Sequence, residues 1–185
     1  SMYKPLIAAL IGCGIAGAAE SFEKLPAGSV DNSPTEYGPL STLTGEARIL
    51  KEARLARSGT SALRLMGGES SVQLNFAAPL TEDTLGTLGI QRWTRQGDFA
   101  FTCTAVTPEG EKEVAAADNK LGVGGYKQRL EFTLPAGTTA LRLSCRSHAE
   151  GGVLIDDLAL HSGKMEVTSL TFINPGPFPL LKRAP

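Results

Sequence analysis

The segment KQRLEFTL, residues 127–134, alternates polar with apolar side chains in its second half. Successive side chains of an extended chain point to opposite faces, so Leu130, Phe132 and Leu134 share one face. The polar residues between them share the other. Such alternation is typical of a β-strand that buries one face and exposes the other.

The same alternation recurs at short intervals through the body of the chain. The strand candidates are residues 21–25, 62–65, 72–76, 85–95, 99–103, 127–134, 141–145 and 153–160. Turn-forming residues separate them, as at Gly67-Gly68 and Gly151-Gly152. Residues 51–57 are compatible with a short helix, but no segment has the period of a long amphipathic helix. The sequence therefore predicts an all-β fold, an antiparallel β-sandwich or jelly roll.

Length and charge limit the classes of function. The chain has 185 residues, with 18 Lys and Arg against 19 Asp and Glu. This length fits one domain with an appendage, and it is sufficient for a hydrophobic core. The balance of charges argues against nucleic acid as a partner, because phosphate binding needs a surplus of basic residues.

The first 19 residues, including Ser1 as a cloning residue, are predicted to be a signal peptide. Lys4 precedes an apolar run over residues 6–19, which ends in small residues before Glu20. The run is shorter than the roughly 20 residues that a membrane-spanning helix needs. We therefore expect a secreted, periplasmic or cell-surface protein with no membrane contact after the signal is removed.

Two other motifs overlap this leader. Leu10-Ile11-Gly12-Cys13 is similar to a lipoprotein box, in which Cys13 would carry a lipid, and this alternative stays open. Residues 12–17 also match the dinucleotide-binding pattern GxGxxG, which requires a helix directly after it. The residues that follow contain several prolines and no helical period, so nucleotide binding is not predicted.

The composition changes after Gly163. Residues 165–173 are compatible with a last strand, whereas residues 174–179, NPGPFP, cannot continue a ladder because proline lacks the backbone donor. Such a run favours an extended, semi-rigid spacer. We therefore expect a β-sandwich domain over residues 20–163 and a last strand with a Pro-rich linker over residues 164–185, leading toward a further domain.

The candidate reactive side chains are two cysteines, two histidines and the acids. Cys103 and Cys145 share the apolar faces of their strands, so they form either a disulfide in an exported protein or two small buried side chains. His148 and His161 lack metal-ligand spacing, and no GxSxG elbow or recognisable pair of glycosidase acids occurs. We therefore expect that this segment is not an enzyme.

Four stretches together carry a family resemblance. They are Glu20-Ser21-Phe22-Glu23, Ser58-Gly59-Thr60-Ser61-Ala62-Leu63-Arg64-Leu65, Gln91-Arg92-Trp93-Thr94 and Gly152-Val153-Leu154-Ile155-Asp156-Asp157-Leu158. Over about residues 20–163 the chain resembles the N-terminal jelly-roll domain of secreted bacterial exo-sialidases, a galactose-binding-like fold similar to carbohydrate-binding modules. The resemblance implies a non-catalytic accessory module of a bacterial glycoside hydrolase. It also implies two partners, a glycan such as a sialylated host glycoprotein and the catalytic β-propeller of the same polypeptide.

Four acids are predicted to hold one structural calcium ion: Glu20, Glu23, Asp156 and Asp157. In the modules that this chain resembles, the first and last strands lie side by side and share such an ion. Calcium takes about six to eight oxygen ligands, commonly carboxylates and backbone carbonyls. Asp156 alternates in phase with Leu154 and Leu158, which predicts a carboxylate on the core side. Arg or backbone N–H groups are the alternative partners for that charge.

The candidate sugar-binding residues are Trp93, Arg92 and Arg142. Trp93 is the only tryptophan, and it alternates in phase with Gly89 and Gln91, away from the predicted core. An aromatic face suits a sugar ring, and arginine pairs with carboxylates through two hydrogen bonds, so an acidic glycan is one possible ligand. Alternatively, Trp93 packs under the C-terminal segment or against a neighbouring domain. The module is then a structural spacer that orients the propeller and has no ligand of its own.

Overall fold

The computed structural model describes residues 19–162 of the chain. The predicted leader, except Ala19, and the predicted last strand with its linker lie outside these residues. The described elements are β1 (Gly28–Ser29), β2 (Ser33–Thr35), β3 (Gly38–Thr44), β4 (Ala47–Lys51), the 3₁₀ helix η1 (Ala53–Leu55), β5 (Ser61–Asn75), β6 (Thr84–Arg92), β7 (Phe99–Thr107), β8 (Gly110–Ala117), β9 (Gln128–Leu134) and β10 (Ala140–Ser162). Within the described part, no helix has the length and apolar character that crossing a membrane requires.

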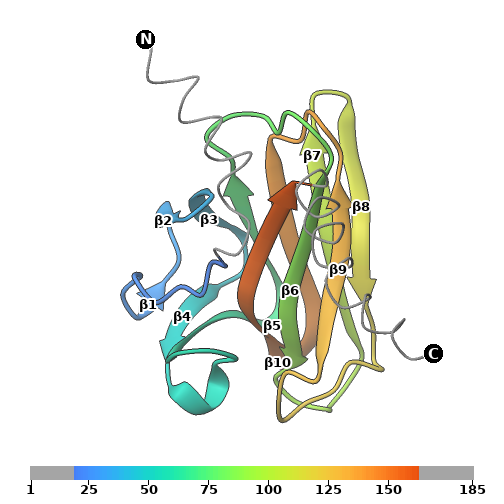
Figure 1. The fold of residues 1–185 in the computed structure, drawn as a ribbon. Helices are drawn as coiled ribbons and strands as arrows, with labels where there is room; N and C mark the ends of the chain where they lie inside the picture. Colours follow the sequence, from blue (N-terminus) through green and yellow to red (C-terminus); the bar gives the residue numbers. More distant parts are fainter. Residues whose placement is uncertain (1–18, 163–185) are drawn as a thin grey trace, which may run out of the picture.

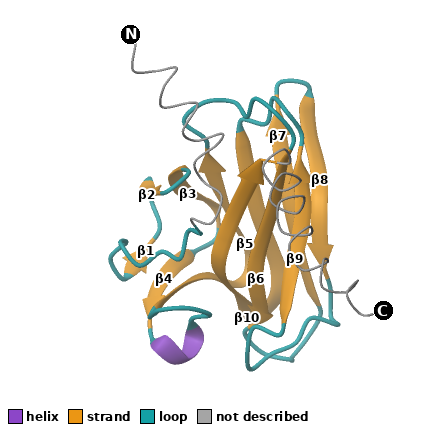
Figure 2. Cartoon of the chain, in the orientation of Figure 1, coloured by secondary structure: helices purple, strands orange, loops and turns teal. Residues whose placement is uncertain are grey.

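The strands form two layers, which we call sheet I and sheet II (Figure 1 and Figure 2). Sheet I has the order β2-β3-β5-β10-β7-β8, and sheet II has the order β1-β4-β5-β10-β6-β9. The named strands pair antiparallel in both layers. β5 and β10 belong to both layers: one half of each pairs with the other in sheet I, and the remaining halves pair in sheet II.

Glycines allow these two long strands to bend between the layers. The pairing of β5 with β10 shifts between Ser147 and Gly152. Gly152 has a φ of +107°, and a Cβ added there would lie 2.2 Å from the carbonyl oxygen of Leu65. Only glycine tolerates both the conformation and the close approach. The prediction that Gly67-Gly68 and Gly151-Gly152 are turns between strands is therefore wrong, because they are bends inside continuous strands.

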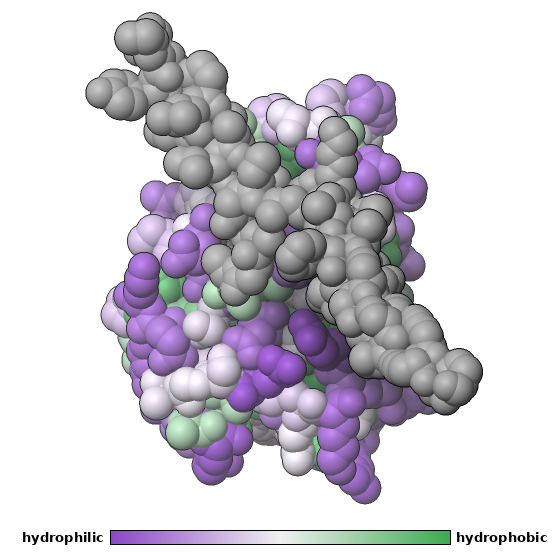
Figure 3. Space-filling view, in the orientation of Figure 1, coloured by the Kyte–Doolittle hydropathy of each residue, from purple (hydrophilic) through white to green (hydrophobic). Residues whose placement is uncertain are grey.

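One hydrophobic core lies between the layers. Leu141 and Leu143 enter it from sheet I, and Leu63 and Ile90 enter it from sheet II. Each such side chain contributes about 1.5–3 kcal/mol when fully buried. Many polar residues cover the face of the molecule seen in Figure 3. The predicted all-β antiparallel sandwich is confirmed.

The N-terminal part differs from the prediction. Residues 21–25 are not a strand; instead Glu20 alone forms an antiparallel bridge with Leu158 of β10. Phe22 has a φ of +62°, which turns the chain away from β10 after this single bridge. The segment over residues 51–57, compatible with a helix, contains the single turn η1.

Cys103 and Cys145 are buried free thiols on the neighbouring strands β7 and β10. Cys103 lies opposite Leu143, and Cys145 lies opposite Phe101, so the two cysteines are diagonal neighbours. Burial raises the pKa of both thiols, that of Cys145 to about 11. The structure therefore supports the interpretation as small buried residues over the disulfide.

Candidate functional site

Trp93 directly follows β6 on the outer face of sheet II. Its backbone N–H donates to the carbonyl oxygen of Gly152 at 3.0 Å. Its half-buried side chain packs on a small apolar cluster outside the main core, which includes Leu55 and Leu154. The Arg64 guanidinium lies 3.5 Å from the indole centroid, a cation–π contact. The predicted orientation of Trp93 away from the main core is confirmed.

A cavity of about 300 Å³, the Trp93 cavity, opens beside this ring. Its walls include η1, the end of β6 and the glycine loop at Gly124-Gly125. Gln91 Oε1 accepts a hydrogen bond from Gly125 N–H at 2.7 Å, which holds the glycine loop in place. The Tyr126 hydroxyl donates to the carbonyl oxygen of Leu55 and connects the same loop to η1.

Arg92 also lines this cavity, but its guanidinium is engaged with the backbone. The residue is only 5% exposed. It donates to the carbonyl oxygens of Asn119, Arg95 and Gly97 at 3.0, 3.3 and 2.9 Å. These bonds join the loops that follow β6 and β8. Arg92 therefore holds together two loops that line a neighbouring cavity, and the structure does not bring its guanidinium to the Trp93 ring.

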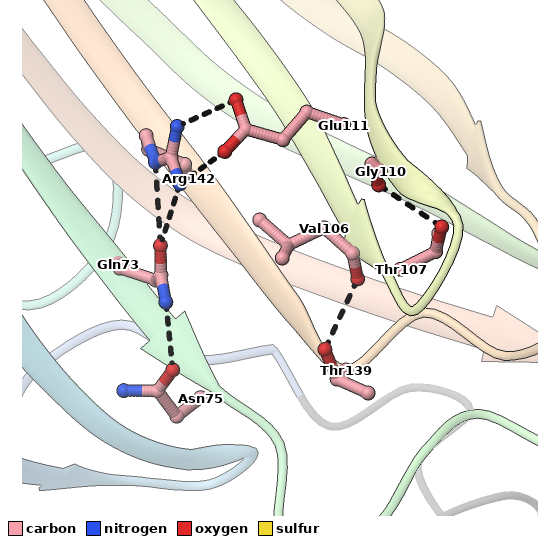
Figure 4. A network of polar contacts seen from close by, with 8 residues as sticks. All are labelled: Gln73, Asn75, Val106, Thr107, Gly110, Glu111, Thr139 and Arg142. Carbon is pink, nitrogen blue, oxygen red and sulfur yellow. Dashed lines mark hydrogen bonds and ion pairs between the residues drawn. The ribbon is translucent and has the colours of Figure 1, made fainter.

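Arg142 lies on the outer face of sheet I, so the structure does not bring it to Trp93. Its guanidinium donates to both carboxylate oxygens of Glu111 on β8, at 3.0 and 2.9 Å. It also donates to Gln73 Oε1 on β5 at 3.2 Å, and Gln73 donates to Asn75 Oδ1 at 2.9 Å (Figure 4). The hydrogen bonds and charge of Arg142 hold the pKa of Glu111 below its ordinary value. Arg142 is thus the centre of an ordered polar network that crosses the sheet.

A groove of about 250 Å³ lies beside this network, and we call it the sheet I groove. The strand register aligns Ser71, Ser144 and Thr102 across β5, β10 and β7. These short side chains line the groove, and the hydroxyls of Thr44 and Ser71 are hydrogen-bonded at 2.8 Å.

Longer side chains flank this row of hydroxyls on both sides. Two residues from the Ser71–Ser144 pair in one direction, Gln73 lies opposite Arg142. Two residues from it in the other direction, Glu69 lies opposite Arg146. A row of short residues between two rows of long ones leaves a hollow on a pleated surface. Sequence analysis missed the groove residues, although their positions, alternating with core residues of β7 and β10, indicate an outward face.

The predicted calcium ligands divide into separate clusters. Glu20 Oε2 and Oε1 accept the backbone N–H groups of Phe22 and Glu36, both at 2.6 Å. Glu23 instead accepts hydrogen bonds from Thr60 and Ser61 in the loop before β5. Burial opposes ionisation of Glu23, but these hydrogen bonds outweigh it and lower its pKa.

Asp156 and Asp157 hold a different loop, which lies between η1 and β5. Asp156 Oδ2 accepts the N–H groups of Arg57 and Ser58 at 2.8 and 3.1 Å, and its Oδ1 accepts the N–H of Asp157. Asp157 pairs with the Arg57 guanidinium at 2.8 Å and accepts the Ser58 hydroxyl. Burial and the charge of Asp157 raise the pKa of Asp156 to about 6, despite the backbone hydrogen bonds.

The predicted orientation of Asp156 toward the core is wrong. A register shift between Asp156 and Ala159 places Leu158 in the main core, whereas Leu154 belongs to the outer cluster of sheet II. Asp156 is fully buried because the loop at residues 57–58 covers it. Backbone N–H groups, the alternative to a metal, are its partners.

The four carboxylates are not gathered at one point in this arrangement. Among residues 19–162, no three His, Cys, Asp or Glu side chains gather closely enough to hold a metal. N–H and O–H groups of the protein already donate to these carboxylates. Calcium binding stays a prediction, with its test given below.

Comparison with known proteins finds similarity to this chain in structure alone. No protein-family model and no curated protein matches the sequence. The fold is similar to a structure of the Clostridium thermocellum endo-1,4-β-D-xylanase 10B, comprising its CBM22-1 and GH10 modules with xylohexaose, with a TM-score of 0.51 and 12% identity over 77% of this chain. It is also similar to an exo-β-agarase, with a TM-score of 0.52 and 12% identity over 78% of this chain.

The similarity involves a limited part of each of those larger proteins. This chain covers 27% of the xylanase chain and 25% of the agarase chain. Identities this low establish a shared fold and nothing further. The described domain thus has an antiparallel jelly-roll fold similar to that of carbohydrate-binding modules.

Proposed function

We propose that this domain is a carbohydrate-binding accessory module of a secreted glycoside hydrolase and that the sheet I groove holds the sugar. The observation that supports this most directly is the ordered set of hydroxyl, amide, guanidinium and carboxylate groups on one open sheet face. The Arg142 network and the row of Ser71, Ser144 and Thr102 form this set.

Sugar hydroxyls both donate and accept hydrogen bonds, so a sugar site needs both kinds of group at fixed positions. Serine and threonine hydroxyls in the groove provide both. The Arg142–Glu111 pair adds charged donors and acceptors whose orientation is already held by two hydrogen bonds. Because the protein already holds these groups in place, binding of the sugar costs less side-chain conformational entropy.

The finer parts of the proposal come from the sequence. The resemblance to bacterial exo-sialidases supports a sialidase parent, a catalytic propeller in the same polypeptide and a sialylated glycan. The apolar run before Glu20 supports export to the periplasm, cell surface or medium. The domain itself is proposed to be non-catalytic.

A glycan array followed by calorimetric titration tests the function. The wild-type chain is expected to bind a glycan, and Arg142→Ala is expected to weaken that binding about tenfold, because charged hydrogen bonds contribute roughly 1.5–3 kcal/mol. Ser144→Phe, which fills the groove, is expected to abolish binding. Arg48→Ala is the matched control, because Arg48 forms a similar 2.9 Å pair with Glu46 on sheet II.

Two results would contradict the proposal. If no glycan binds, the alternative function as a structural spacer is favoured. If a glycan binds and both sheet I variants retain its affinity, the groove is not the site.

A further inference from the structure

We infer that the Trp93 cavity is a second ligand site, separate from the sheet I groove, and that it takes a single sugar unit carrying a carboxylate. This inference rests on the proposed carbohydrate-binding function and adds a site and a ligand class to it. It is supported by three features of the cavity: its charge, its aromatic wall and its size.

Two guanidinium groups lie at the cavity and its indole. Arg54 lines the cavity, and Arg64 covers the indole. Among the ion pairs of the described residues, only Arg54–Glu52 involves either of these two arginines. A partly enclosed site with an excess of one charge attracts ligands of the opposite charge.

Arg64 is incompletely hydrogen-bonded. Its Nη2 donates to the carbonyl oxygen of Gly151 at 2.8 Å, but its buried Nε has no hydrogen-bond partner. Burial lowers its pKa, although Glu46 and Glu150 act in the opposite direction from beyond ion-pair distance. A negative charge beside the indole would therefore stabilise Arg64 electrostatically.

Arg54 is the side chain that is available to a ligand. It pairs with Glu52 at 3.1 Å, and both side chains are more than half exposed, at 75% and 52%. Such surface pairs contribute little, so a carboxylate in the cavity can replace Glu52 at low cost. Arginine binds a carboxylate through two parallel hydrogen bonds, which gives the site its preference for this group.

The rest of the cavity suits a sugar ring. The indole of Trp93 offers apolar surface for the carbons of a sugar ring. At Gly124 and Gly125 the loop lacks side chains, and a Cβ added at either position would meet open space. A volume of about 300 Å³ lies at the small end of ligand pockets, which favours one sugar unit over a long chain.

The position of the only tryptophan makes the inference directly testable. Fluorescence of the full chain would be titrated with glucuronic acid and, separately, with N-acetylneuraminic acid at constant ionic strength. Glucose and acetate are the comparison ligands. Glucose has the sugar ring without the carboxylate, and acetate has the carboxylate without the ring. We expect a saturable fluorescence change with at least one of the two carboxylated sugars, at concentrations where glucose and acetate cause none. Comparing the two titrations identifies which acidic sugar fits.

Variants then locate the binding. Arg54→Gln is expected to weaken the acidic sugar about tenfold, because it removes a charged pair of hydrogen bonds. Arg129→Gln is the matched control, an exposed arginine on the outer face of the same sheet that donates to Thr87. Raising the salt concentration should also weaken binding, because the attraction is electrostatic.

Equal binding of glucose, equal binding of acetate, or an unchanged affinity in Arg54→Gln would overturn the inference. So would the absence of both a fluorescence change and calorimetric heat with either acidic sugar. Arg142→Ala separates this site from the proposed function: it should impair the sheet I groove and leave the fluorescence titration unchanged. A glycan that binds wild-type chain without a fluorescence change supports the groove alone.

Discussion

The outer faces of the two sheets follow the same alternation but have different surroundings. On sheet I the outward residues Ser71 and Ser144 are short and polar and line an open groove. On sheet II the outward residues Ala62 and Leu154 are buried beneath η1 and partly buried aromatic side chains. An outward position in a strand therefore lines an open groove on one sheet and belongs to a second small core on the other. The experiments below test this difference in order of decreasing expected effect.

Asp156→Ala should have the largest effect, because it removes the anchor of the loop that covers sheet II. Three backbone N–H groups, of Arg57, Ser58 and Asp157, would lose their acceptor. Unsatisfied buried donors cost about 1–3 kcal/mol each, so we expect a loss of about 3 kcal/mol in the free energy of unfolding by urea. Ser144→Ala on sheet I is the control, with an expected change below about 0.5 kcal/mol. Equal losses in the two variants would refute the difference between the faces.

The same carboxyl predicts a dependence on pH. Its pKa rises from 3.8 to about 6 in the folded protein, so the folded state binds this proton more tightly than the unfolded state. The resulting stabilisation is fully present below pH 3.8 and is lost as the pH rises through about 6. We expect the unfolding free energy of wild type to fall between these pH values relative to Asp156→Asn, which does not titrate. A pH-independent difference between the two proteins would contradict this assignment.

Trp93→Ala should have an intermediate effect on stability. The indole packs on the outer apolar cluster and against Arg64, so its removal should destabilise the fold by about 2 kcal/mol, less than for a fully buried tryptophan. Arg142→Ala on sheet I should cost less than about 1 kcal/mol, because its pair with Glu111 is partly exposed. Thermal unfolding of the two variants provides the comparison, and a larger loss in Arg142→Ala would reverse it.

Calcium should have the smallest effect. Protein donors already satisfy Glu20, Glu23, Asp156 and Asp157, so millimolar calcium or a chelator should shift the melting temperature by less than about 1 °C. Magnesium serves as the control for general ionic effects. A rise of several degrees with calcium alone would show that these carboxylates rearrange around the ion.

Alternation in the sequence predicted the inward residues well. Leu141, Leu143 and Leu63 are in the core because a period of two is a local property of an extended chain. The outward orientation of Trp93 followed from the same rule. The rule failed at Asp156, since the register shift after it reverses the parity of all later residues, and a bulge leaves no clear mark in the sequence.

The candidate site was predictable only in part. Arg142 was identified as an outward arginine, but its partners Gln73 and Glu111 lie 69 and 31 residues away in the chain. The sheet I groove depends on which strands are neighbours, and the sequence gives no direct measure of strand order. The separation of Arg142 from Trp93 has the same origin, because β10 contributes different halves to the two sheets.

The passage of β5 and β10 through both sheets has a mechanical consequence. In a sandwich whose two sheets share no strand, the layers can separate while each sheet keeps its hydrogen bonds. Here two continuous strands of the one chain pass from one sheet to the other, so separating the layers also requires breaking the ladder between β5 and β10. Amide protons in the two halves of these strands should then exchange with solvent at a common, slow rate, and a load applied to one sheet would be transmitted to the other.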